Sequence, residues 1–294
     1  MPIYVPGKLT LAKQFTQQSY MWEFPAQYGL WSPANITTAL WLDAADANTV
    51  TTVSGAVSQW NDKSGNGRNA SQPTSSRRPT YSTAFLNSKA VVSFDGGDDI
   101  LGFSDTTLAS NVSAISYFFV AVSNNPSSSD YRAFIDVNNN NSASDRASVY
   151  FRSSTIEAGG RRLDGDSYQF HQAGTVTTSA CIGSVVFDYQ TTSLGIAFNG
   201  SAISYRAGSF QTAGTTSNTN SSFISIGASN DFNVDAFTGL SNGAHNCRIA
   251  EIIAVQSAVS ISIKEKLEGY LAHKWGLEAN LPSNHPYKTV GPTP

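Results

Sequence analysis

The chain has 294 residues and a formal net charge of −3 at pH 7, and only 13% of its residues are charged. That share is about half of what a globular domain usually carries. The basic residues are scattered, which argues against a nucleic-acid-binding surface, and no segment approaches the ~18 consecutive apolar residues of a membrane-spanning helix. Hydrophobic residues make up 40% of the chain, enough for the core of one large domain.

The first 30 residues carry aromatic side chains at irregular spacing. No helical or alternating period organises them, so this segment does not form one element with a core of its own. It is either a strap lying across the domain or, as we favour, an arm that docks on another subunit, because aromatic residues anchor interfaces. The segment also lacks the apolar run and cleavage site of a secretory signal peptide. The aromatic residues of the predicted docking arm are Tyr4, Phe15, Tyr20, Trp22, Phe24 and Tyr28.

From residue 39 onward, short apolar or alternating segments are separated by loops rich in Asn, Ser and Gly, a pattern typical of β-strands. The runs at Ile115–Val122 and Cys181–Phe187 are nearly continuous in apolar residues, which indicates central strands covered on both faces. At least eleven such segments predict an all-β fold, a jelly-roll sandwich of two antiparallel sheets. The predicted strands are Ala39–Leu42, Val57–Trp60, Ala90–Phe94, Ile115–Val122, Arg132–Asp136, Ser148–Arg152, Thr175–Thr178, Ala180–Phe187, Leu194–Phe198, Ser222–Ile226 and Ile249–Val255.

One helix is predicted, from Ile263 to Trp275. Its apolar residues recur at helical spacing, which gives the helix one hydrophobic face, and we expect that face to pack on the sandwich. Ser262 and Glu265 match a capping box at the start of the helix. Gly276 stands where a left-handed cap is expected at the end.

Two cysteines, Cys181 and Cys247, lie in strand-like segments. They can pair with each other or remain buried thiols. We favour free thiols, because disulfides form mainly in exported proteins and the sequence shows no export signal.

Three stretches of sequence carry a resemblance to a known family. They are ALWLDAADANTVTTVSGAVSQWNDKSGNGRNA at 39–70, AVVSFDGGDDIL at 90–101 and RIAEIIAVQSAVSISIKEKLEGYLAHKWGLEANLPSNHPY at 248–287. Together they resemble the laminin-G-like, concanavalin A-like lectin and glucanase domains found in bacteriophage particles and bacterial surface proteins. The resemblance implies a concanavalin A-like jelly roll over residues 31–288, followed by a flexible tail at 289–294. Because this fold hosts lectins, glycosidases and structural modules alike, it does not set the function.

Catalytic patterns are missing from the sequence. Glycoside hydrolysis needs two carboxylates about 5–10 Å apart, which retaining glucanases of this fold carry on one strand as Glu-x-Asp-x-x-Glu or Glu-x-Asp-x-Glu. None of the glutamates has that spacing. The histidines and cysteines complete neither a nucleophilic triad nor a zinc site. We therefore expect a protein that is not an enzyme and that requires no cofactor.

An acidic loop follows the predicted strand at residues 90–94. Asp95, Asp98 and Asp99 place three carboxylates within five residues, and calcium prefers oxygen-rich loops of this kind. Laminin-G-like domains also bind calcium at the rim of the sandwich. The alternative is a plain turn, in which Asp95 accepts hydrogen bonds from loop amides. Asp43 and Asp62, in the motifs LDAAD and WNDKSGNG, are instead expected to belong to the signature of the fold, with Asp43 capping a turn.

A sugar site would need an aromatic platform beside polar side chains, because a sugar stacks its apolar face and forms hydrogen bonds at its edges. The sequence favours no single platform, so a glycan site is implied by the resemblance but not located. The aromatic residues beside polar loops are Tyr131, Tyr150, Tyr168, Phe170 and Tyr189.

The sequence therefore predicts a non-enzymatic structural protein on the surface of a bacteriophage virion, as a capsid decoration or tail-fibre subunit docked by residues 1–30. Its partners would be other virion proteins or further copies of itself, with a trimer suggested by family analogy. The alternative is a carbohydrate-binding module that attaches to host or surface glycans. A glycoside hydrolase with an unusual active site is the least favoured interpretation.

Overall fold

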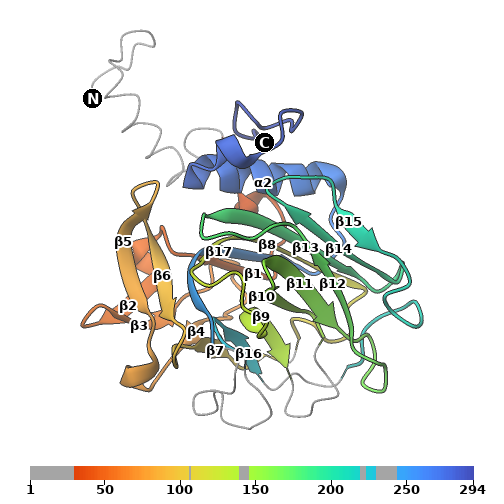
Figure 1. Cartoon of the computed structure of the whole chain (residues 1–294), viewed down its shortest axis with the longest axis horizontal. Helices are drawn as coiled ribbons and strands as arrows, with labels where there is room; N and C mark the ends of the chain where they lie inside the picture. The colour runs from red at the N-terminus through yellow and green to blue at the C-terminus, as the bar shows by residue number, and fades with distance from the viewer. Residues whose placement is uncertain (1–29, 106, 139–145, 219–222, 230–243) are drawn as a thin grey trace.

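The computed structural model describes residues 30–105, 107–138, 146–218, 223–229 and 244–294. These residues form a β-sandwich with one α-helix, α2 (Ile261–Trp275), lying across one of its faces (Figure 1). The aromatic residues of the predicted docking arm lie outside the described residues. Among the described residues, no helix is both long enough and apolar enough to span a bilayer.

Two curved antiparallel sheets make up the sandwich. In the sheet that carries α2, which we call the helix-side sheet, β8 and β13 pair through eight residues each, and β17 pairs with β8 on its other edge. Beyond β17 lie β1 and β6, which pair with different halves of it. The strands of the helix-side sheet are β1 (Leu40–Asp43), β5 (Thr80–Leu86), β6 (Lys89–Asp95), β8 (Ala114–Ser123), β13 (Cys181–Asp188), β14 (Ser193–Phe198), β15 (Ser204–Arg206) and β17 (Asn246–Val255).

The opposite sheet, which we call the far sheet, runs in the order β12, β11, β10, β9, β16 and β7. A hairpin of β2 and β3 joins the two sheets at one edge, because β3 pairs with both β5 and β4 and β4 pairs with β7. The strands of the far sheet and of this junction are β2 (Val50–Val53), β3 (Ala56–Trp60), β4 (Ala70–Ser71), β7 (Leu101–Phe103), β9 (Arg132–Asn138), β10 (Ser148–Arg152), β11 (Thr155–Gly160), β12 (Gln169–Ala173) and β16 (Phe223–Ile226).

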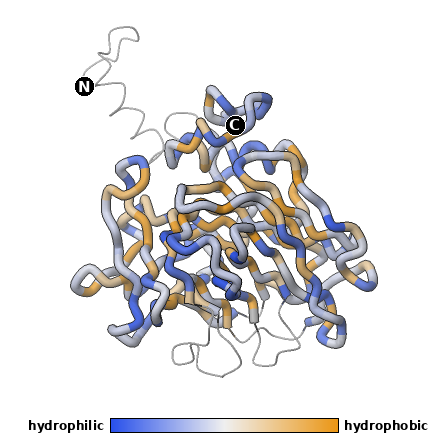
Figure 2. The backbone as a smooth tube through the Cα atoms, viewed as in Figure 1, coloured by the Kyte–Doolittle hydropathy of each residue, from blue (hydrophilic) through white to orange (hydrophobic). Residues whose placement is uncertain are grey.

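The alternation of side chains along β8 explains why its sequence is apolar throughout. Tyr117 and Phe119 belong to the hydrophobic cluster between the two sheets. Phe118 and Val120 point to the other face and belong to a second cluster, with Leu267 and other residues of α2. Hydrophobic residues accordingly concentrate in the central strands and hydrophilic residues in the loops (Figure 2). The predicted all-β sandwich with a C-terminal amphipathic helix is confirmed.

Helix α2 begins two residues earlier than predicted. Its N-cap is Ser260, whose hydroxyl accepts a hydrogen bond from the backbone N–H of Ile263 at 3.3 Å, so the predicted capping box of Ser262 and Glu265 is wrong. Both serines are suitable caps, and the structure uses the first of them. The end of the helix is as predicted, because Gly276 adopts the left-handed conformation with φ +69°.

Most predicted strands are present, but the segment Thr175–Thr178 is not a strand. Only Val176 is buried in it, and its backbone N–H donates to the carbonyl of Ser154 in the turn between β10 and β11. The three threonines around Val176 favour a strand by residue type, but the segment lacks a pairing partner strand in the structure.

Both cysteines are free and buried, as expected. Cys181 lies at the start of β13 and Cys247 near the start of β17. Burial raises the pKa of the Cys181 thiol to about 12, so this side chain stays protonated at neutral pH and behaves as a core residue.

Candidate functional site

The acidic loop between β6 and β7 brings its three carboxylates together. One oxygen from each of Asp95, Asp98 and Asp99 lies within 4.8 Å of the others. The loop is also held as a turn, because Asp95 Oδ1 accepts from the backbone N–H of Gly97 at 2.7 Å and Asp99 Oδ2 accepts from that of Asp95 at 2.9 Å. The turn that was the alternative to a calcium site is therefore present, and the three carboxylates lie close together within it.

Electrostatic repulsion within this cluster contributes to a raised pKa of Asp99. Burial, together with the negative charges of Asp95 and Asp98, raises the pKa of Asp99 to about 6. A bound cation would relieve this repulsion and restore the ionised form. The residues fit a hard cation that takes oxygen ligands, such as Ca²⁺, and calcium binding stays a prediction.

We expect calcium to raise the melting temperature of the protein and expect the double variant Asp98→Asn, Asp99→Asn to lose that response. At pH 5 the effect should shrink in the unmodified protein, because Asp99 takes up a proton below about pH 6 and the proton competes with the cation. Thermal unfolding with and without calcium measures this. Asp130→Asn, which removes a half-exposed carboxylate elsewhere, is the control. An equal calcium response in the double variant would exclude the site.

Glu251, the acidic residue in the middle of β17, is fully buried beneath α2. Its Oε1 accepts hydrogen bonds from Trp41 Nε1 at 2.7 Å and from Tyr270 OH at 2.9 Å. Its Oε2 accepts from Lys274 Nζ and from Trp275 Nε1, both at 2.8 Å. Four donors thus saturate this carboxylate, which ties the helix to the sheet and leaves it unavailable for acid–base chemistry.

Asp43 is part of the same buried network. Lys274 Nζ lies 2.7 Å from Asp43 Oδ1, and Lys63 Nζ lies 2.9 Å from Asp43 Oδ2. Burial opposes ionisation of Asp43, but the two ammonium groups prevail and hold its pKa below its usual value. Asp43 Oδ1 also accepts from the backbone N–H of Ala45 at 3.1 Å, the turn contact expected from the sequence.

Asp62 organises the loop that carries Lys63. Its carboxylate accepts hydrogen bonds from the backbone N–H groups of Trp41, Ser64 and Arg68 at 2.9–3.1 Å. The motifs LDAAD and WNDKSGNG are therefore structural, as the sequence suggested.

The remaining described glutamates do not suggest hydrolysis either. Glu157 and Glu268 are fully buried, and they form ion pairs with Arg152 at 3.2 Å and with Lys264 at 2.8 Å, respectively. Glu265 lies on α2, away from these strands. None of the described glutamates forms the one-strand pair of carboxylates that a retaining glucanase of this fold uses.

The aromatic residues that the sequence suggested as sugar platforms differ in how accessible their rings are. Tyr150 and Tyr189 are buried and donate their hydroxyls to Asp136 and to a backbone carbonyl, which excludes both as platforms. Tyr131 and Phe170 are exposed, by 44% and 41%. An arginine lies over each ring, Arg152 over Tyr131 and Arg206 over Phe170, so neither ring presents a free face on that side.

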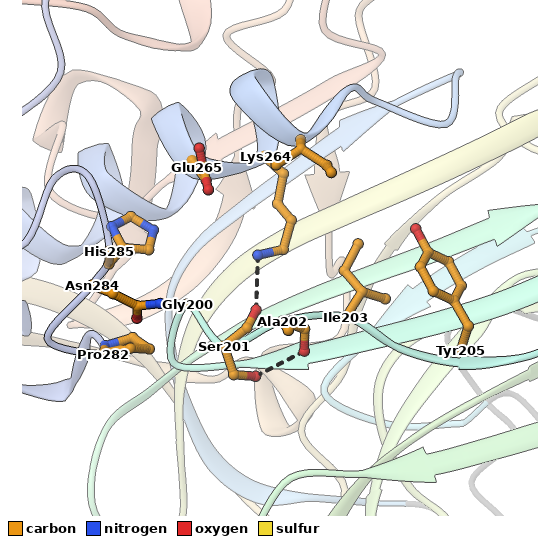
Figure 3. A pocket seen from close by; sticks show the side chains of 11 residues that line it. Gly200, Ser201, Ala202, Ile203, Tyr205, Lys264, Glu265, Pro282, Asn284 and His285 are labelled. Atoms are coloured by element: carbon orange, nitrogen blue, oxygen red, sulfur yellow. Dashed lines mark hydrogen bonds between the residues drawn. The ribbon is translucent and has the colours of Figure 1, made fainter.

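A pocket of about 380 Å³ lies where the β14–β15 connection, the start of α2 and the segment after the helix meet (Figure 3). Tyr205 forms part of its wall and is 56% exposed. None of these residues was predicted as a site residue. The lining residues are Gly200, Ser201, Ala202, Ile203, Tyr205, Ile261, Lys264, Glu265, Pro282, Asn284 and His285.

Two glycines shape this pocket. Gly200 follows Asn199 in a tight turn where both residues have positive φ, +51° and +76°, as an Asn-Gly hairpin turn requires. A Cβ on Gly200 would lie 2.6 Å from the side chain of Leu281, so the glycine also lets the C-terminal segment approach. Gly195 on β14 lies beneath the ring of Tyr205, where a Cβ would come within 2.7 Å of it.

The lining is divided into an apolar and a polar side. Ile203 and Tyr205 lie on one side, and Asn284 and His285 lie opposite them (Figure 3). Glu265 projects from α2 between the two sides. Such a division suits a small ligand that is itself amphipathic.

Comparisons with known proteins identify the fold and not a family. No protein-family model matches the chain, and no curated protein matches its sequence. Among solved structures it is similar to the binding domain of botulinum neurotoxin serotype D, with a TM-score of 0.55 and 12% identity over 81% of this chain and 52% of that one. It is also similar to the binding domain of Paraclostridial Mosquitocidal Protein 1, with a TM-score of 0.55 and 13% identity over 79% and 52% of the two chains.

A third similar structure belongs to botulinum neurotoxin type C, whose cell entry is described as dependent on interaction with two ganglioside molecules. It has a TM-score of 0.54 and 16% identity over 82% of this chain and 53% of that one. The chain thus spans about half the length of the structures it matches. These neighbours support the predicted β-sandwich fold, and the association with phage particles stays a prediction.

Proposed function

We propose that this protein is a carbohydrate-binding module without catalytic activity. The observation that carries the proposal is the pocket beside α2, in which an exposed tyrosine faces polar side chains across a small cavity. Sugars are bound by this combination of an aromatic ring and hydrogen-bonding groups. The volume of about 380 Å³ lies within the range of roughly 300–1,000 Å³ that is usual for small-ligand pockets.

The structural neighbours support the same proposal. All three described above are binding domains or belong to a toxin whose cell entry depends on gangliosides, which are glycolipids. The arrangement of the glutamates supports binding without hydrolysis. The carboxylate of Glu251 is occupied by hydrogen-bond donors, and no described glutamate is paired with a second carboxylate as glycoside hydrolysis requires.

We expect the full chain to bind at least one glycan on an immobilised panel and to leave that glycan intact. Binding is read on the panel, and intactness is checked by assaying released reducing sugar. Absence of binding across neutral and acidic glycans would contradict the proposal, and release of reducing sugar would replace it with a hydrolase.

A second proposal is the structural role on a virion surface that the sequence favours, with residues 1–30 as a docking arm. Its support is the firm attachment of the residue that follows this segment. The backbone N–H of Trp31 donates to the carbonyl of Pro292 at 3.0 Å, and its ring packs edge-on against Tyr270. An arm that starts here would therefore begin from a fixed base beside α2.

Removing residues 1–30 is expected to leave a folded domain but abolish self-assembly. Size-exclusion chromatography with light scattering compares the mass of the full chain with that of a chain starting at Trp31. A defined oligomer that becomes a monomer without the arm would support the structural role. An oligomer that persists in the shortened chain would exclude docking through the arm.

A further inference from the structure

We infer that the pocket beside α2 takes the uncharged end of a saccharide, a neutral pyranose, and discriminates against sialylated ends. This inference rests on the proposed function and adds to it the class of sugar and the roles of individual residues. It follows from the charges, the hydrogen-bonding groups and the aromatic surface of the pocket, taken in turn.

The charges of the pocket lining leave a net negative group. Lys264 is buried, and its ammonium is neutralised by Glu268, which lies 2.8 Å away and is also buried. Among the residues that the structure describes, Glu265 has no ion-pair partner. A ligand in the pocket therefore meets the uncompensated carboxylate of Glu265. An acidic sugar would be repelled by this charge, whereas a neutral sugar can donate hydroxyl hydrogen bonds to it.

The remaining polar groups of the pocket suit the hydroxyl groups of a sugar and not a charged substituent on it. Both ring nitrogens of His285 are engaged, one 3.3 Å from Glu268 Oε2 and the other accepting from the backbone N–H of Tyr287 at 3.2 Å. Lys264 Nζ donates to the carbonyl of Ser201 at 2.9 Å and to Glu268, which leaves one of its three hydrogens. The exposed amide of Asn284 offers both a donor and an acceptor.

The apolar side supplies the stacking surface. Tyr205 lies over Gly195, and the absence of a side chain there lets the ring settle on the sheet while 56% of the residue stays exposed. Ile203 and Ile261 extend this surface, and Ile261 is 71% exposed. A pyranose has one face of C–H groups and a rim of hydroxyls, so a saccharide can stack one ring on Tyr205 and extend its hydroxyls past Ile203 toward Glu265 and Asn284 (Figure 3).

The test measures binding of the full chain to a panel of neutral glycans and their sialylated counterparts, followed by titration of the best neutral glycan. We expect the sialylated forms to bind at least about tenfold more weakly. Tyr205→Ala should weaken binding of the neutral glycan by about tenfold or more. Tyr131→Ala is the matched control, since Tyr131 has a similar exposure of 44%, and it should leave binding unchanged.

Two further variants keep the test decisive. Asn284→Ala alters only an exposed loop side chain and should also weaken binding, which guards against a folding defect in Tyr205→Ala. Glu265→Gln should reduce the difference in affinity between sialylated and neutral glycans, because it removes the negative charge that repels the sialylated forms.

The possible results separate this inference from the proposed function. Glycan binding that survives in both Tyr205→Ala and Asn284→Ala would overturn the pocket and leave the carbohydrate-binding function standing. A preference for sialylated glycans would overturn the neutral specificity alone. No binding of any glycan by the unmodified chain would overturn both.

Discussion

Replacing Lys274 by methionine is expected to destabilise the protein by about 3–5 kcal/mol, the cost of leaving buried charges unpaired. Lys274 is only 2% exposed, and its ammonium lies 2.7 Å from Asp43 and 2.8 Å from Glu251. Without it, no described cationic side chain pairs with Glu251, and among the described residues Asp43 keeps Lys63 alone. Burial already raises the pKa of Glu251 even in the presence of Lys274, so its ionised form depends on the lysine.

Chemical unfolding at pH 7 measures this loss. Lys266→Met is the matched control, because Lys266 lies on the same helix and its ammonium contacts the backbone carbonyl of Thr293 and the Trp31 ring, with no carboxylate partner among the described residues. We expect the control to change stability by less than about 1 kcal/mol. A small effect of Lys274→Met would mean that Glu251 is protonated in the folded protein and needs no cation.

The central strands were predictable from the sequence because their environment is the same along a whole apolar segment. β8 and β13 are covered on both faces, so nearly every residue in them is apolar and the strand is visible without any alternation. The C-terminal end of α2 was equally predictable from the sequence, because a left-handed cap favours a glycine and Gly276 stands there.

Edge strands were missed because solvent reaches them. β12 alternates between half-buried and exposed residues, and β5 and β15 are largely exposed, so no fully buried face marks them as strands. The start of α2 was misplaced for a different reason. Ser260 and Ser262 are both good caps by residue type, and only the position of the helix axis decides between them.

The acidic loop could be predicted and the pocket could not. Asp95, Asp98 and Asp99 lie within five residues, so proximity in sequence ensured proximity in space. The pocket instead combines residues near 200–205, 261–265 and 282–285, and each segment alone resembles an ordinary surface turn. The Asn-Gly pair at 199–200 was the one local signal that a tight hairpin turn stands there.

Acidification is expected to destabilise the protein through His245, which is the second large effect. His245 is fully buried, with Nε2 3.0 Å from Ser123 Oγ and its ring packed edge-on against Phe151. Burial, together with the nearby charge of Arg132, lowers the pKa of His245 to about 3. In the unfolded chain the pKa is near 6.5, so the unfolded state gains a proton below that pH and the folded state does not.

The stability that the neutral imidazole contributes is therefore complete above pH 6.5 and is lost progressively as the pH falls toward 3. Between pH 7 and pH 4.5 the loss amounts to about 2–3 kcal/mol. Asp99 acts in the opposite direction, since its pKa is raised to about 6 and its protonation favours the folded state as the pH falls. The comparison must therefore be made between variants at each pH.

Unfolding free energies of the unmodified protein and of His245→Gln, measured at pH 7 and pH 4.5, isolate the contribution of this residue. The variant is expected to be less stable at pH 7 but to lose about 2–3 kcal/mol less on acidification, because glutamine does not titrate. His171→Gln serves as the control, since His171 on β12 is only partly buried and its replacement should change the pH dependence far less. An unchanged pH dependence in His245→Gln would mean that the imidazole takes up its proton within the folded core, with Ser123 Oγ as the acceptor that compensates for the charge.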